Sequence, residues 1–128
     1  MGYAAPMSLG GKRVLIAEDD FFVGQFLCDI VRDAGGMVVG PALDAADALT
    51  LLAATDLPDC AVLDMRLRRS DALPIAAFLE GARVPFIMVT GYHRDWLPPQ
   101  LGKAPYLSKP FAPIELLDTL AMAGATRH

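Results

Sequence analysis

Near its N-terminus the chain reads RVLIAEDD over residues 13–20, a short apolar run followed at once by three acidic residues. A continuous apolar run of this length is typical of a strand buried on both faces, as in a parallel sheet. The following residues are apolar at intervals of three and four, which predicts a helix from about Phe21 to Ala34, capped by Asp20. The fold prediction starts from this unit of strand, acidic junction and helix.

The same alternation continues to the C-terminus. Further strands are predicted at Met37–Gly40 (ended by Pro41), Cys60–Leu63, Pro85–Val89 and Tyr106–Ser108, and further helices after Asp44, from Pro74 to Glu80, and around Ile114–Leu120. Repeated strand–helix units predict an α/β fold, a doubly wound open sheet with helices on both faces. Pro98, Pro99 and Gly102 interrupt the stretch from Tyr92 to Ala104, so we expect a shortened or irregular fourth helix.

Length and composition set the expected domain organisation. The chain has 128 residues, of which 54% are hydrophobic, which suits one domain with one core. We expect a flexible N-terminal tail at residues 1–11, the domain at 12–123 and a short tail at 124–128. This leaves no length for a DNA-binding or catalytic output domain.

Charge and cysteine content restrict the class of protein. The net charge of −4 argues against a nucleic-acid partner. No apolar run reaches the ~18 residues of a membrane span, and no signal peptide begins the chain. Cys28 and Cys60 show neither disulfide nor metal spacing. These features predict a soluble cytoplasmic domain that binds no membrane.

Polar side chains follow four of the five predicted strands. They are Glu18, Asp19 and Asp20 after the first strand, Asp64 after the third, Thr90 after the fourth and Lys109 after the fifth. Because parallel strands end at one edge of the sheet, these groups should meet there. Clustered carboxylates need a cation, and an all-oxygen set suits Mg²⁺. With a lysine and a hydroxyl nearby, the set suits a phosphoryl group on a carboxylate, with Asp64 as the nucleophile.

The motifs LIAEDD (15–20), AVLD (61–64), MVTG (88–91) and YLSKPF (106–111) together resemble those of response-regulator receiver domains. The resemblance covers about residues 12–122. It implies a flavodoxin-like (βα)5 fold with five parallel strands in the order 2-1-3-4-5. It also implies a signalling phosphoacceptor rather than an enzyme in its own right.

The resemblance also implies residue roles. Asp64 is the phosphoacceptor. Mg²⁺ is bound by Asp19, Asp64 and the backbone carbonyl of Arg66, with Glu18 acting through water. Thr90 and Lys109 contact the phosphoryl oxygens, and Tyr106 turns inward as Thr90 moves. The Lys109–Pro110 peptide bond is implied to be cis.

A narrower likeness concerns the segment PFIMVTGY (85–92). It is similar to the Pro-Phe-x-Phe-Ala-Thr-Gly-Tyr segment of the alphaproteobacterial FATGUY single-domain response regulators, with Met88 and Val89 in place of Phe and Ala. The likeness implies a stand-alone receiver in a phosphorelay. Its implied partners are a sensor histidine kinase or histidine phosphotransfer protein and an unknown downstream protein, with the chain a monomer or weak dimer.

The loop after Asp64 departs from the common receiver pattern. Many receivers have Pro four residues after the phosphoacceptor and an Asp-Gly pair further on, whereas this chain has Arg68 and Asp71-Ala72. We therefore expect a different loop shape between residues 65 and 73. The arginines at 66, 68 and 69 are either a solvated basic loop or a guide for the partner. Arg66 and Tyr92, each two residues past a site residue, are placed to tune dephosphorylation.

Two other functions fit parts of the pattern. A phosphorylation-independent adaptor of receiver fold would not need the complete set of site residues. A Mg²⁺-dependent phosphohydrolase with an aspartyl-phosphate intermediate, of the haloacid-dehalogenase type, needs Asp-x-Asp after its first strand. Here the candidate nucleophile follows the third strand, and Arg66 stands at the second Asp position.

Overall fold

The computed structural model describes residues 8–91, 97–101 and 103–124. Its sheet strands are β1 (Arg13–Ala17), β2 (Met37–Ala42), β3 (Cys60–Asp64), β6 (Phe86–Thr90) and β7 (Tyr106–Ser108). Its helices are α1 (Phe21–Asp33), α2 (Ala45–Ala54), α3 (Leu73–Gly81) and α4 (Pro113–Met122), with a short 3₁₀ helix, η2 (Pro99–Leu101). A small hairpin is formed by β4 (Arg66–Leu67) and β5 (Ser70–Asp71).

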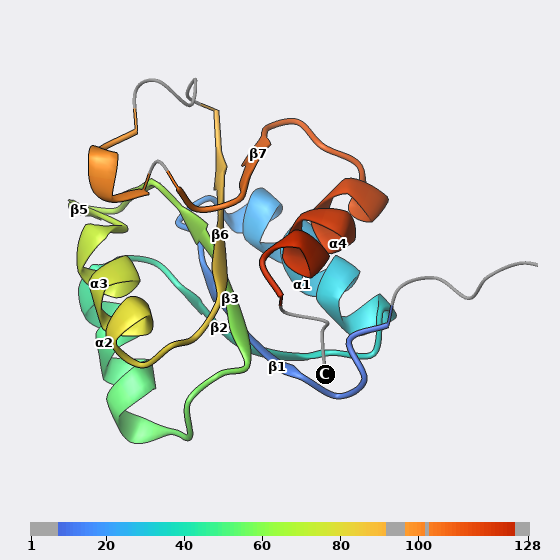
Figure 1. The fold of residues 1–128 in the computed structure, drawn as a ribbon, viewed down its shortest axis with the longest axis horizontal. Helices are drawn as coiled ribbons and strands as arrows, with labels where there is room; N and C mark the ends of the chain where they lie inside the picture. Colours follow the sequence, from blue (N-terminus) through green and yellow to red (C-terminus); the bar gives the residue numbers. More distant parts are fainter. Residues whose placement is uncertain (1–7, 92–96, 102, 125–128) are drawn as a thin grey trace, which may run out of the picture.

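The five main strands form one parallel sheet in the order β2-β1-β3-β6-β7. This is the predicted order 2-1-3-4-5, so the doubly wound flavodoxin-like fold is confirmed. Helices α1 and α4 cover one face, and α2 and α3 cover the other (Figure 1). One apolar core lies under each pair of helices. Every central strand is buried on both faces, which explains why the strands read as continuous apolar runs.

N-cap residues and a first-turn proline correctly predicted where the helices begin. The Asp20 carboxylate accepts a hydrogen bond from the Val23 N–H at 3.0 Å, and Asp44 caps α2 in the same way through the Asp47 N–H at 2.7 Å. Pro74 lies in the first turn of α3. Both predicted caps are therefore confirmed. Between β6 and β7, the described residues contain one short 3₁₀ helix, in agreement with the irregular fourth helix expected there.

The prediction that Pro41 ends the second strand is wrong. Strand β2 continues to Ala42, and because it lies at the sheet edge, the missing N–H of proline costs no ladder bond there. Gly40 adopts φ +105°, and a Cβ at this position would lie 2.7 Å from the Ile16 carbonyl oxygen. The extension has a consequence for the site, because the Ala42 carbonyl accepts the Glu18 N–H at 2.9 Å.

The expectation of a loose tail up to residue 11 fails at Leu9, which is fully buried. Its N–H donates to the Ala34 carbonyl at 2.8 Å, and the Gly11 N–H donates to the Gly35 carbonyl at 2.7 Å. A single leucine among glycine and serine has no periodicity, so the sequence pattern gave no sign of this contact. Residues 1–7 and 125–128 lie outside the described residues.

The hairpin of β4 and β5 is an element that the sequence pattern did not predict. It lies directly after β3, in the loop where a departure in shape was expected. Among the described helices, none has both the length and the apolar composition that a membrane span requires.

Candidate functional site

The predicted site residues meet at the carboxyl ends of the parallel strands. One pocket there is lined by Glu18, Asp19, Asp20, Asp64, Arg66, Leu67, Thr90, Gly91 and Lys109. Glu18, Asp19 and Asp20 come directly after β1, and Lys109 comes directly after β7. Asp64 and Thr90 are the last residues of β3 and β6. Tyr106 does not line this pocket, and Tyr92 lies outside the described residues.

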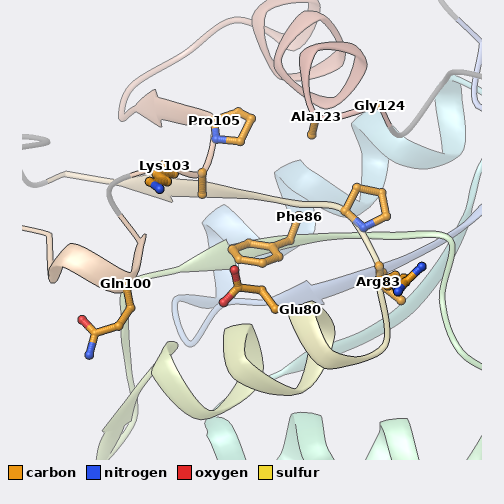
Figure 2. Close-up of a pocket in the computed structure, with 11 residues that line it drawn as sticks. Glu80, Arg83, Phe86, Gln100, Lys103, Pro105, Ala123 and Gly124 are labelled. Carbon is orange, nitrogen blue, oxygen red and sulfur yellow. The ribbon is translucent and has the colours of Figure 1, made fainter.

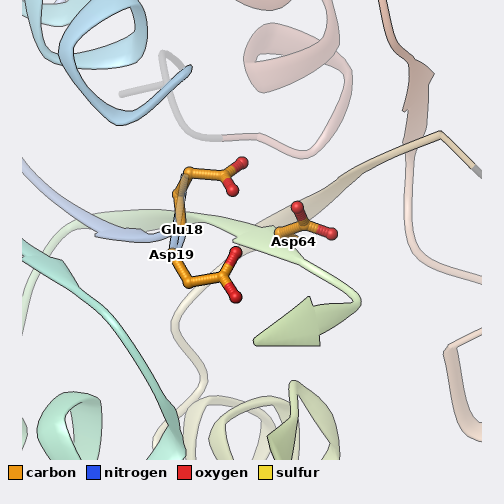
Figure 3. Close-up of side chains that lie close together, drawn as sticks. All are labelled: Glu18, Asp19 and Asp64. Carbon is orange, nitrogen blue, oxygen red and sulfur yellow. The ribbon is translucent and has the colours of Figure 1, made fainter. Parts of the chain in front are cut away.

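Three carboxylates point toward one another in the pocket. Figure 3 shows Glu18 and Asp19 extending from the end of β1 and Asp64 from the end of β3. One carboxylate oxygen from each residue lies within 4.8 Å of those of the other two. Glu18 and Asp64 are buried, with exposed fractions of 2% and 8%, and Asp19 is half-buried. Like charges at this separation repel unless a cation compensates them.

Lys109 supplies one such cation. Its ammonium Nζ donates to Glu18 Oε1 at 2.8 Å and to Asp64 Oδ2 at 2.7 Å. Burial would lower the pKa of Lys109, but its hydrogen bonds to the two carboxylates outweigh burial and raise that pKa above its ordinary value. Burial raises the pKa of the Glu18 carboxyl, and the bond from Lys109 offsets only part of this effect. Lys109 therefore remains charged at neutral pH.

Backbone N–H groups also hold the carboxylates of the pocket in place. The Asp20 N–H donates to Glu18 Oε2 at 3.1 Å, and the Arg66 N–H donates to Asp64 Oδ1 at 3.2 Å. The Lys109 N–H donates to the Thr90 carbonyl at 3.0 Å, which joins the ends of β6 and β7. The pocket is thus preorganised by the strand ends themselves.

Thr90 and the Lys109–Pro110 peptide complete the local geometry. The Thr90 side chain is fully buried at the edge of the pocket. The Lys109–Pro110 peptide bond is cis, the form that the resemblance implies, and a second cis bond lies at Gly40–Pro41.

The carboxylate cluster fits a hard divalent cation by its donor chemistry. Glu18, Asp19 and Asp64 offer only oxygen ligands, which Mg²⁺ prefers over nitrogen or sulfur. Lys109 pairs with both Glu18 and Asp64 although it carries only one positive charge, and Asp19 has no ion-pair partner among the described residues. The cluster therefore has more carboxylates than cationic groups, and a cation bound next to Asp19 would offset the excess negative charge.

Tyr106 has a different environment. It is half-buried, packs against the core under α2 and α3, and its hydroxyl accepts a hydrogen bond from the Ser108 hydroxyl at 3.2 Å. Tyr106 is thus the first residue of β7, and its side chain packs against this core and does not line the pocket.

A second cavity lies at the other end of the parallel strands, where β6 and β7 begin (Figure 2). It is lined by residues that include Glu80, Arg83, Phe86, Gln100 and Lys103. Figure 2 shows the Arg83 and Gln100 side chains on opposite sides of this cavity, so its polar groups do not converge on one point.

The sequence pattern did not predict that the arginines after Asp64 lie on a hairpin. Arg66 lies on β4 at the pocket rim, and Arg68 and Arg69 form the turn between β4 and β5. Neither turn residue is glycine, asparagine or aspartate, so the usual hairpin signal is absent. The departure from the common receiver pattern at these positions was the only available sign.

Comparison with known proteins identifies the relatives of this chain. A model of the response regulator receiver domain matches residues 14–121. The chain is 30% identical over 116 residues to the transcriptional regulatory protein PdtaR of Mycobacterium tuberculosis, covering 88% of this chain and 56% of PdtaR. It is 32% identical over 117 residues to nodulation protein W of Bradyrhizobium diazoefficiens, covering 86% of this chain and 50% of that protein. The chain thus spans about half the length of these curated relatives.

Solved structures show the same fold. The receiver (REC) domain of the PhyR response regulator from Erythrobacter litoralis superposes with a TM-score of 0.78 at 26% identity, covering 90% of this chain and 91% of that one. SdrG from Sphingomonas melonis superposes with a TM-score of 0.74 at 29% identity, covering 91% and 96% of the two chains.

Proposed function

The chain belongs to the family of response regulator receiver domains, which act in two-component signalling, and we propose that it accepts a phosphoryl group on Asp64 in a Mg²⁺-dependent reaction. The observation that carries the proposal is the position of the Asp64 carboxylate. It lies at the end of β3, 2.7 Å from the Lys109 ammonium and inside the acidic cluster. A carboxylate held beside a fixed cation is placed to attack phosphorus and to share the resulting charge.

In this proposal the transfer is a direct displacement at phosphorus. A carboxylate oxygen of Asp64 forms the new O–P bond, while the bond from phosphorus to the donor atom breaks. The donor atom keeps the electron pair and takes a proton from solvent. Lys109 and the Thr90 hydroxyl face the incoming phosphoryl oxygens from the ends of β7 and β6.

Asp19, Asp64 and the Arg66 backbone carbonyl would hold Mg²⁺, with Glu18 acting through water. Bound there, the ion neutralises charge on the phosphoryl oxygens. Glu18 also holds Lys109 in place through the 2.8 Å ion pair. Thr90 and Tyr106 form the proposed switch, in which Tyr106 moves toward the pocket as the Thr90 hydroxyl turns to the phosphoryl group.

The proposed donor is a sensor histidine kinase or a histidine phosphotransfer protein in the cytoplasm. At the start of α1, next to the pocket, Phe21 and Phe22 have exposed fractions of 69% and 80%. Exposed aromatic rings beside a reactive group are typical of a protein contact surface. A downstream protein would then bind the phosphorylated form, and the chain would act as a monomer or weak dimer.

Labelling with a small phosphodonor tests the proposal. In the presence of Mg²⁺, we expect wild type to incorporate phosphate and Asp64→Ala to incorporate none. Asp29→Ala, on the exposed surface of α1, is the matched control and should label as wild type does. Equal labelling of wild type and Asp64→Ala would contradict the assignment of Asp64. The absence of label from wild type would favour the phosphorylation-independent adaptor, and steady release of phosphate at many turnovers would favour the phosphohydrolase.

Arg66 and Tyr92 are proposed to tune the lifetime of the phosphorylated form. Arg66 is exposed at the pocket rim, two residues after Asp64, where a side chain affects the access of water to phosphorus. We expect Arg66→Asn to change the rate at which label is lost after the donor is removed. Identical decay in the two proteins would contradict this role.

A further inference from the structure

The hairpin of β4 and β5, next to the acidic pocket, carries two exposed arginines at its turn. Arg68 and Arg69 are exposed at its turn, and within the described residues neither forms an ion pair. The protein as a whole carries a net charge of −4. Three of its 11 lysines and arginines fall within residues 66–69, a local concentration of positive charge that only Asp71 offsets within the hairpin itself.

The hairpin is anchored to the fold. Leu67 is buried in the core under α2 and α3. The Arg68 N–H donates to the Leu43 carbonyl at 3.1 Å, and the Ser70 hydroxyl accepts the Ala45 N–H at 3.0 Å. The Ala72 N–H donates to the Met65 carbonyl at 3.0 Å and closes the base of the hairpin. The backbone of the hairpin, and with it the point from which each arginine side chain extends, is thus held in place relative to β3 and Asp64.

Two carboxylates on adjoining elements bond to backbone N–H groups and not to the hairpin arginines. Asp44 is used by the N-cap of α2, where its Oδ1 accepts the Asp47 N–H at 2.7 Å. Asp71 Oδ1 accepts the Leu73 N–H at 2.9 Å. Both carboxylates keep their negative charge, but among the described residues neither forms an ion pair with Arg68 or Arg69, and both arginines are exposed to solvent.

We propose that Arg68 and Arg69 form an electrostatic guide that draws anionic phosphoryl donors to Asp64. The inference rests on the proposed function and deepens it by naming a class of donor. A phosphate-bearing donor approaches a pocket that contains three carboxylates, and their charge opposes its approach. Two guanidinium groups carried by the anchored hairpin reduce that barrier and raise the encounter rate without contacting the reacting atoms. Arg68 and Arg69 are therefore positioning residues for the encounter.

The test compares phosphorylation rates at low and high salt. The probe is acetyl phosphate, a dianion at neutral pH, and the variant is Arg68→Gln/Arg69→Gln. At low ionic strength we expect its second-order rate constant to fall about three- to tenfold below that of wild type. At about 0.5 M salt the two rates should converge, because the attraction between charges is then screened beyond a few ångströms. Phosphoramidate, which carries less negative charge at neutral pH, should show a smaller difference.

The matched control is Arg32→Gln/Arg83→Gln. It removes the same net charge from exposed positions away from the pocket, and Arg83, like Arg69, has a left-handed backbone, with φ +59° against +57°. The control should keep the wild-type rate at every salt concentration.

Three outcomes would overturn the guide. They are equal rates for wild type and the hairpin variant at low salt, an equal loss in the control, and a loss that salt does not reduce. If wild type takes no label from either donor, the proposed function fails and the guide fails with it. If wild type labels normally but the hairpin arginines have no effect, only the guide fails.

Discussion

At the scale of single residues, the acidic pocket is electrostatically unbalanced. Lys109 pairs with Glu18 and Asp64, while Asp19 adds a third carboxylate within 4.8 Å. We therefore expect Asp19→Asn to stabilise the metal-free protein by on the order of 1 kcal/mol, or a few degrees in Tm, because it removes one repelling charge. Thermal unfolding in EDTA measures the effect. Asp29→Asn on the α1 surface is the control, and an unchanged or lower Tm for Asp19→Asn would contradict the prediction.

Cys60 permits a prediction of pH dependence. Burial raises the pKa of this thiol to about 12, from an ordinary value of 9.0. Between these two values the unfolded chain loses the thiol proton while the folded protein keeps it, so stability falls as pH rises. We expect wild type to lose up to about 1.4 kcal/mol more stability per pH unit in this window than Cys60→Ala. Urea unfolding at pH 8 and pH 11 measures the difference. If the difference in free energy of unfolding between wild type and Cys60→Ala stays constant with pH, the thiol ionises equally in the folded and unfolded states and the prediction is wrong.

At the scale of elements, sequence patterns predicted those parts of the chain whose structure is set by nearby residues. The caps at Asp20 and Asp44 follow from short-range chemistry, and the strand runs follow from burial on both faces. The hairpin after β3 and the continuation of β2 through Pro41 depend on contacts between distant segments. Arg68 bonds to Leu43, and Gly40 leaves room for the Ile16 carbonyl. A pattern confined to one segment carries no information about such contacts.

The N-terminal segment gives an element-scale prediction of stability. Leu9 is fully buried and closes the core under α1 and α4. Leu9→Ala should therefore cost about 2–5 kcal/mol, the usual range for a buried leucine. Gly36→Ala should also destabilise, because its Cβ would lie 2.8 Å from Leu9 Cδ1 and 2.9 Å from Val31 Cγ1.

The two changes should couple, since Leu9→Ala removes one of the atoms that a Cβ at Gly36 would meet. The double variant should be more stable than the sum of the two single losses predicts. Denaturant unfolding of the four proteins completes the cycle. Strict additivity, or a cost for Leu9→Ala below about 0.5 kcal/mol, as for a surface change, would show that the segment is loosely attached.

At the scale of the whole molecule, the fold turns four separate sequence signals into one site. Glu18, Asp64, Thr90 and Lys109 are up to 91 residues apart in the chain, yet Lys109 bonds directly to Glu18. Convergence of the strand ends was predictable from the parallel topology alone. The distribution of charge among the carboxylates was not, because it depends on which oxygens Lys109 reaches. The sequence pattern was therefore sufficient to predict the fold, but it did not predict how charge is distributed within the site.

Because the site joins the ends of several strands, a cation bound there should stabilise the entire domain. If Mg²⁺ binds only the folded state, a concentration one hundred times its Kd adds about 2.7 kcal/mol to the free energy of unfolding. For a chain of this size we expect Tm to rise by roughly 8–15 °C and to depend on the logarithm of Mg²⁺ concentration. EDTA should reverse the rise, and Asp19→Asn should greatly reduce it while starting from a higher metal-free Tm. The Tm curves of wild type and Asp19→Asn should therefore cross as the Mg²⁺ concentration rises. A general salt effect would raise the Tm of both proteins equally, and that result would refute a cation site at the strand ends.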